Sequence, residues 1–183
     1  MKWLNDFGCR QFKKEYHGNA VTELRIWADE NLARIPSEPK SIIALSDPAL
    51  DDVASAYGEL KIRRACEKDA RGSKICVTFG PTGAAKVLFA LRQNCLTPWD
   101  DAIREHFEWD GSVKSYRRFL DTVRTEIVEL AEDAHHLGIV ESEIPKALGR
   151  AQSSLPKIVD EYYWVTITQG FQIPERVELS RWG

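Results

Sequence analysis

Apolar side chains recur at helical spacing along most of this chain, and that periodicity constrains its fold more than any other feature. The clearest stripe lies within residues 113–130, where it comprises Val113, Tyr116, Phe119, Leu120, Val123, Ile127 and Leu130. An apolar stripe of this width has to be buried against other elements of the fold. The sequence therefore predicts helices packed around a shared core.

Several other segments carry the same helical period. They are residues 19–35, 48–60, 84–91, 100–108, 141–150 and 155–168. Asp47-Pro48 is typical of a helix start, and we expect that helix to continue toward Cys66 and to be broken by Gly72. The apolar run at 41–45 fits a helical turn or a buried strand, and 74–79 is a second strand candidate. The sequence thus predicts an all-α, mainly helical, compact bundle with one or two short strands.

Length and composition fit one domain that spans residues 1–183. Hydrophobic residues make up 43% and charged residues 29% of the chain, which argues against a disordered protein or a coiled coil. No apolar run approaches the ~20 residues of a membrane helix, and residues 1–18 do not resemble a secretory signal. We expect a soluble, cytoplasmic monomer with no membrane partner.

Potential metal ligands do not have the spacing of a metal site. Adjacent histidines at positions 135 and 136 point about 100° apart on a helix and suit the end of a helix dipole better than a shared ion. The cysteines, which lie far apart and fit reduced structural thiols, are Cys9, Cys66, Cys76 and Cys95. We expect neither a metal nor a cofactor.

The distribution of charge is more informative than the net charge of −3. Basic segments at 61–74 and 113–124 bracket an acidic segment at 98–110. This pattern fits a carboxylate site flanked by phosphate contacts, with Lys74 and Lys114 as candidate DNA contacts. It also fits ordinary solvated helix faces.

Gly80-Pro81-Thr82-Gly83 predicts a tight turn that leads into a helix. Unpaired N–H groups and the helix dipole make such a position suitable for a phosphate, and glycine allows a close approach of the backbone. The candidate DNA contacts here are Gly80, Thr82 and Gly83, with Lys86 adding a charge. The alternative is a turn with no ligand.

Pro98-Trp99-Asp100 follows about one short helix later. A carboxylate shielded by Trp99 can act as a base on water or can stabilise positive charge on a sugar. Asp100 is the candidate catalytic residue, with Asp101 as an alternative acid, and N-capping of the next helix is the competing role for Asp100. Tyr57 lies on an apolar stripe, from which its hydroxyl can reach a pocket.

Residues 80–104 resemble the helix-hairpin-helix DNA glycosylases. The resemblance consists of the glycine turn, the small-residue helix at 84–88 and the Pro-x-Asp sequence that ends at Asp100. It implies that Gly80 and Gly83 hold a phosphate of double-stranded DNA and that Asp100 drives removal of a flipped-out base. It also implies a base pocket near Trp99 and Tyr57, and a site within residues 74–108.

The chain departs from the family pattern in several ways: the stretch from turn to aspartate is a little short, and the iron–sulfur cysteine cluster of some members is absent. The glycines are spaced Gly80-x-x-Gly83, one residue longer than the usual G-x-G, and Gly83 stands where bifunctional members carry a lysine nucleophile. The resemblance therefore implies a monofunctional glycosylase that leaves an abasic site, in base-excision repair or in defence against modified phage DNA. The alternative is a non-catalytic helical module that binds DNA or another protein.

Overall fold

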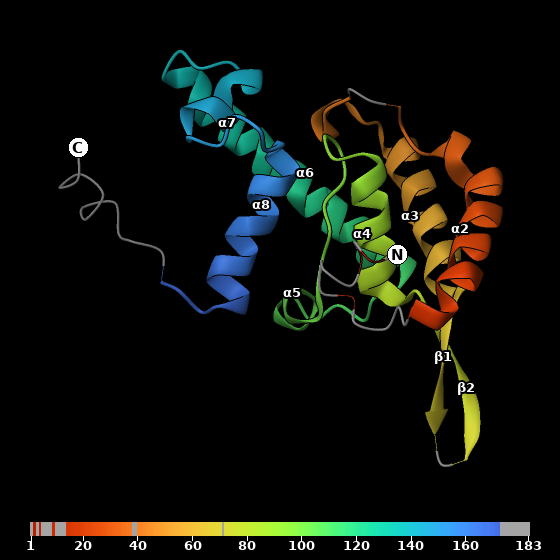
Figure 1. Cartoon of the computed structure of the whole chain (residues 1–183). Helices are drawn as coiled ribbons and strands as arrows, with labels where there is room; N and C mark the ends of the chain where they lie inside the picture. Colours follow the sequence, from red (N-terminus) through yellow and green to blue (C-terminus); the bar gives the residue numbers. More distant parts are fainter. Residues whose placement is uncertain are drawn as a thin grey trace.

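The computed structural model describes residues 14–37, 40–70 and 72–172, together with residues 2, 4 and 9. In this part of the chain, α-helices surround one core and a single two-stranded sheet projects from them (Figure 1). The helices are α2 (His17–Asn31), α3 (Asp47–Ile62), α4 (Gly80–Leu91), α5 (Asp101–His106), α6 (Val113–His136), α7 (Ile144–Ala147) and α8 (Leu155–Tyr163). The prediction of a mainly helical fold is confirmed.

Helix α6 lies at the centre of the core, where it packs against α3 and α8. The Ser112 hydroxyl caps its first turn by accepting a hydrogen bond from the Ser115 N–H at 3.1 Å. Its apolar stripe is fully buried from Tyr116 to Ile127, whereas Val113 is exposed at the start of the helix. The stripe predicted from the sequence is therefore the face that α6 turns toward the core.

Helix α3 supplies the second wall of the core. Its N-cap is Ser46, whose hydroxyl accepts from the Ala49 N–H at 3.4 Å, so the cap lies one residue before the predicted Asp47. Leu50 and Leu60 are fully buried along the inner face of the helix. The chain turns out of the helix at Arg63, which has an extended backbone.

Strands β1 (Arg64–Ala70) and β2 (Ser73–Thr78) form an antiparallel hairpin that extends away from the helices (Figure 1). The expectation of a helix continuing toward Cys66 is wrong, and the strand expected near 74–79 is confirmed. Cys66 pairs with Val77 and Lys68 with Ile75, while Gly72 makes the turn with φ of 84°. Pairing between separate segments outweighs the local helical period here, and the β-branched residues of β2 favour it.

Two other segments differ from their predicted helices. Residues 141–150 contain only a 3₁₀ turn, Glu141–Glu143, and the short α7, which ends near Gly149 at φ of 70°. Residues 155–168 divide into α8 and a π-helical segment, η5 (Trp164–Thr168). The run at 41–45 contains a 3₁₀ turn, Ile42–Ala44. The helical-turn interpretation of this run is therefore confirmed, and the strand interpretation is wrong.

The lengths and compositions of the helices bear on membrane insertion. Within the described ranges, none of them combines the length and the apolar character needed to span a bilayer.

Candidate functional site at the start of α4 and α5

Helix α4 begins at Gly80, so the turn predicted at residues 80–83 is the first turn of the helix itself. Gly80 has φ of 68°, and Phe79 at the N-cap position provides no side-chain cap. The element before Phe79 is strand β2, so a helix-hairpin-helix arrangement is not seen here. Gly83 is buried inside the helix, which corrects its assignment as a DNA contact, whereas Thr82 remains half-buried at the surface.

Asp100 lies at the N-terminus of α5 and caps it. Its Oδ1 accepts a hydrogen bond from the Ile103 N–H at 2.9 Å. Its Oδ2 lies 3.5 Å from the Oγ1 of Thr168, the last residue of η5. The capping role considered from the sequence is therefore present, and it uses one carboxylate oxygen.

A cavity of about 240 Å³ lies beside the first turn of α4. Its lining comprises Cys9, Phe79, Gly80, Pro81, Thr82, Asp101 and Arg104. Of the two candidate acids, Asp101 lines this cavity and Asp100 does not. The position next to the glycine turn thus belongs to Asp101.

Three polar groups bridge α4 and α5 at this cavity. The Arg104 guanidinium donates to Thr82 Oγ1 at 3.0 Å and to the Asp101 carboxylate, and Thr82 Oγ1 lies 3.5 Å from Asp101 Oδ1. Burial lowers the pKa of Arg104, and nearby Tyr57 and the Asp100 carboxylate oppose that effect. Sequence reasoning missed Arg104; the signal was its i,i+3 spacing from Asp101, which places both on one face of a helix.

Trp99 and Tyr57, predicted to line a base pocket, are fully buried in the aromatic core. Tyr57 stacks on Tyr116 with ring centroids 4.0 Å apart, and Trp99 stacks on Phe119 at 5.1 Å. The base-pocket assignment is corrected, because neither ring offers a surface to a ligand. Burial also raises the pKa of Tyr57.

The two buried rings instead hold the site together. Trp99 Nε1 donates to the Pro81 carbonyl at 3.4 Å and so links the start of α5 to the first turn of α4. The Tyr57 hydroxyl donates to the Gly111 carbonyl at 2.8 Å, which fixes the loop between α5 and α6. The Arg104 guanidinium also lies over the Trp99 ring, 5.4 Å from its centroid.

The predicted lysine contacts differ in their surroundings. Lys74 is exposed on β2 and lies 3.7 Å from the Glu67 carboxylate, and Lys114 is exposed in the first turn of α6. Lys86 is half-buried in α4, where its charge lowers the pKa of Asp160, a carboxyl whose pKa burial raises. Lys74 and Lys114 are thus the more exposed of the three lysines.

Arginines of the basic segment 113–124 are mostly paired with acids of the same chain. Arg117 forms ion pairs with Asp47 and Asp51, and Arg124 pairs with Asp47 and Asp121. These contacts join α6 to the start of α3 and explain part of the charge pattern as fold stabilisation. Within the other segment, 61–74, residue 71 lies outside the described residues.

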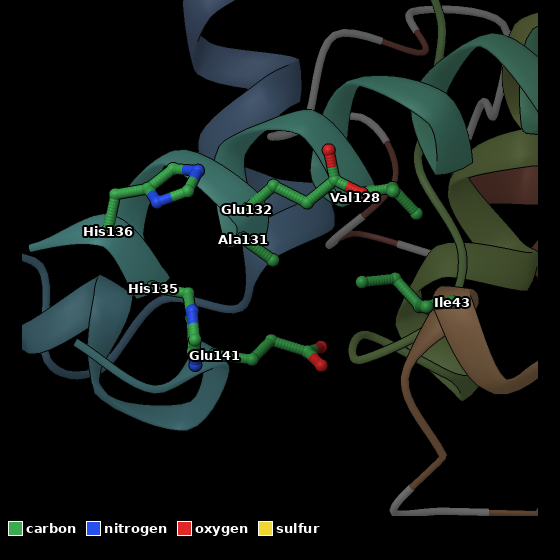
Figure 2. Close-up of a pocket in the computed structure, with 7 residues that line it drawn as sticks. All are labelled: Ile43, Val128, Ala131, Glu132, His135, His136 and Glu141. Carbon is green, nitrogen blue, oxygen red and sulfur yellow. The ribbon is translucent and has the colours of Figure 1, made fainter. Parts of the chain in front are cut away.

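A larger cavity, of about 420 Å³, lies at the far end of α6 (Figure 2). Its lining comprises Ile43, Val128, Ala131, Glu132, His135, His136 and Glu141. The two imidazoles project to different sides of the helix, with ring centroids 6.5 Å apart. Among the residues that the structure describes, no group of three histidine, cysteine or acidic side chains is arranged to hold a metal ion.

Comparison with known protein families, curated proteins and solved structures finds no match for this chain. A functional assignment therefore depends on the residues and their geometry. At the junction of α4 and α5, the described residues bring together a largely buried guanidinium, an exposed carboxylate and a glycine-containing helix start.

Proposed function

We propose that this protein is a monofunctional DNA glycosylase that holds DNA at the start of α4 and uses Asp100 to cleave an N-glycosidic bond. The observation that carries the proposal is the junction of α4 and α5. The Trp99–Pro81 hydrogen bond brings the first turn of α4 to the residue next to Asp100. Helix α4 begins, and α5 lies, at the end of the molecule from which the β-hairpin extends (Figure 1).

The carboxylate of Asp100 is suited to this chemistry because its cap occupies a single oxygen. Oδ1 is fixed by the Ile103 N–H, and Oδ2 accepts a long hydrogen bond from Thr168 Oγ1 at 3.5 Å, which positive charge developing on a deoxyribose ring can replace. The bond from C1′ to the base then breaks. Water adds a hydroxyl group to C1′ and its proton goes to the departing base, which leaves an abasic site.

Contacts to the DNA strand come from the surface around this junction. Phe79 does not cap the first turn of α4, and the N–H groups of Gly80 and Thr82 there suit a phosphate oxygen. Lys74 on the projecting hairpin and Lys114 at the start of α6 add sequence-independent phosphate contacts. Such contacts position a duplex without selecting a base.

A stacking surface for an everted base is offered by Trp164. This residue is about half exposed and begins the π-helical segment whose last residue, Thr168, contacts Asp100. π-Helical turns are rare and are frequent at functional sites. Trp164 therefore takes the role that buried Trp99 and Tyr57 cannot fill.

The stacking role can be tested with two substitutions at one position. Trp164→Ala should weaken binding of a short single-stranded oligonucleotide by about 5- to 100-fold, the effect of one lost base–aromatic stack. Trp164→Phe should restore most of that affinity. Equal affinity of the wild type and Trp164→Ala would remove Trp164 from the site.

A non-catalytic DNA-binding module is the second candidate function. The observation in its favour is the N-cap, because capping alone accounts for an aspartate at position 100. This candidate predicts salt-dependent DNA affinity with no release of base from any substrate.

Release of base from modified duplexes separates the two candidates. The substrates are duplexes with oxidised, alkylated or deaminated bases, and phage genomes that carry modified bases. The informative variant is Asp100→Asn, since asparagine caps a helix as well as aspartate but lacks the charge. We expect base release to fall by at least about 100-fold, with the melting temperature and DNA affinity little changed.

Glu105→Gln, which removes one exposed charge from the same helix, is the matched control and should keep the wild-type rate. Equal rates for Asp100→Asn and the wild type would exclude Asp100 as the catalytic acid. DNA binding without base release from the whole panel would favour the non-catalytic module.

A further inference from the structure

We infer that Asp101 is an internal competitor for a DNA phosphate: in the free protein its carboxylate holds Arg104 and Thr82, and a phosphodiester displaces it. The inference rests on the proposed function and deepens it. It names Arg104 and Thr82 as ligands of the DNA phosphate and Asp101 as the group that the phosphate displaces. It assigns Arg104, which the sequence did not single out, as the cation that receives the DNA backbone.

Among the described residues, three polar side chains of the cavity contact one another. Arg104 donates to the Asp101 carboxylate and to Thr82 Oγ1, and the Thr82 hydroxyl is within 3.5 Å of the same carboxylate oxygen. An oxyanion therefore already accepts hydrogen bonds from a guanidinium and a hydroxyl. These are donor types that proteins use for phosphate, and the planar guanidinium suits it particularly well.

The exposure of the two charged partners is strongly unequal. The Arg104 side chain is 11% exposed, whereas that of Asp101 is 79% exposed. A guanidinium with so little exposed surface has lost much of its water, and it gains from a paired anion. The Asp101 carboxylate can rotate into solvent at little cost, so the anion is exchangeable while the cation stays fixed.

Neighbouring groups keep the cation in place when the anion changes. The Trp99 ring lies under the guanidinium, and the charge of Asp100 favours its protonated form. The cavity also borders the first turn of α4 at Gly80 and Pro81. A phosphate in the place of the Asp101 carboxylate would thus lie beside the positive end of the α4 dipole.

An ordinary i,i+3 ion pair on a helix surface is the competing explanation. Such a pair has two mobile, hydrated partners and contributes little. Here one partner is buried, lies over an aromatic ring and also binds a residue of another helix. The arrangement is that of an anion-binding site that the Asp101 carboxylate occupies.

The test measures binding of an unmodified 12-base-pair duplex by the full chain, using fluorescence anisotropy. Asp101→Asn removes the competitor, and Glu105→Gln is the matched control: its charge also acts on Arg104, but it does not line the cavity. We expect Asp101→Asn to bind about tenfold more tightly than Glu105→Gln, the scale of one charge-assisted hydrogen bond. Equal gains for the two variants would show general charge removal and overturn the inference.

A second pair of measurements places the effect at the cavity. In a Thr82→Val background, which removes one ligand with little change of volume, the gain from Asp101→Asn should shrink to that of Glu105→Gln. Inorganic phosphate should raise the melting temperature of Asp101→Asn more than that of Glu105→Gln. A full gain in the Thr82→Val background, or an equal response to phosphate, would overturn the inference.

The outcome is separate from that of the catalytic proposal. If Asp101→Asn gains affinity as expected while no substrate loses a base, the phosphate site stands and the glycosylase assignment fails. If base is released through Asp100 while Asp101→Asn behaves like Glu105→Gln, the glycosylase stands and the competitor role of Asp101 is excluded.

Discussion

The two cavities at opposite ends of α6 differ in how their polar groups are held. The smaller cavity, beside α4 and α5, contains an 11% exposed guanidinium that bonds to two other side chains. The larger one, at the end of α6, is lined by exposed Glu132, His135 and His136 over an apolar floor (Figure 2). Among these described polar residues, Glu141 accepts a hydrogen bond from the Ser41 hydroxyl at 2.6 Å.

The two cavities therefore differ in hydration as well as in volume. A charged group that has lost its water gains the most from a ligand of opposite charge, whereas an exposed charged group is already stabilised by hydration. The charged group with little exposed surface, the Arg104 guanidinium, lies in the smaller cavity. We therefore expect substitutions at the two ends of the molecule to differ in their effect on the free energy of unfolding.

The largest effect is expected from Trp99→Ala. Trp99 is fully buried, stacks on Phe119 and bonds to Pro81, so its loss leaves a cavity under the proposed site. We expect the free energy of unfolding to fall by about 3–5 kcal/mol. His136→Ala, at the other cavity, should change it by less than about 0.5 kcal/mol because the side chain is exposed. Urea unfolding of both variants measures the contrast, and similar losses would contradict it.

A pair of glycines gives a closer comparison. Gly111 (φ 74°) and Gly138 (φ 76°) have the same left-handed backbone, but a Cβ on Gly111 would lie 2.9 Å from Pro81 Cγ, while that on Gly138 would meet open space. Gly138→Ala should cost about 1–2 kcal/mol for the backbone alone. Gly111→Ala should cost about 2–4 kcal/mol, because overpacking adds to the same backbone term. Thermal unfolding distinguishes the two, and equal costs would mean that the loop shifts freely away from α4.

The fold was predictable where a single segment carries its own signal. The α6 stripe and the N-cap at Asp100 follow from local spacing and chemistry, whereas the cap of α3 lies one residue before Asp47. The β-hairpin does not, because strand β1 depends on pairing with β2, and residues 64–70 show no alternation that identifies them alone. The shortening of the helix expected at 141–150 has a local cause, since Pro145 and Gly149 restrict it to a single short helix.

The sequence predicted that the glycine turn and the start of the next helix lie together, but not which side chains face each other there. The sequence pointed to Gly80 and Asp100, and the structure brings the two helix starts together. It could not show that Trp99 faces the core, because the same aromatic residue suits a pocket wall or a core equally well. Nor could it show that Asp101 faces the glycine turn, because a one-residue step around a helix changes the direction of a side chain by about 100°.

A smaller effect is expected at the larger cavity from Ser41→Ala. The Ser41 hydroxyl donates to Glu141 and also accepts from the Ile43 N–H at 3.4 Å. We expect a loss of about 0.5–1.5 kcal/mol in the free energy of unfolding, the ordinary value of a side-chain hydrogen bond. The same substitution should leave duplex binding unchanged. Loss of DNA affinity in Ser41→Ala would make the larger cavity a part of the binding surface and would break the contrast between the two ends.

The smallest effect should appear as a pH dependence at the loop that supports the smaller cavity. The Ser115 hydroxyl and the Ser112 N–H both donate to Asp110 Oδ1, at 2.6 and 2.9 Å, and they hold the pKa of Asp110 below its usual value. A carboxyl whose pKa is lower in the folded state contributes its full stabilisation above the unfolded pKa of about 3.9, and loses it as the pH falls through the lower, folded value. Wild type should therefore melt above Asp110→Asn at pH 6, and the difference should narrow as the pH approaches 2. A difference that stays constant over this range would mean that the two serines bind the neutral and the charged carboxyl equally well, and that the loop beside α4 does not depend on this charge.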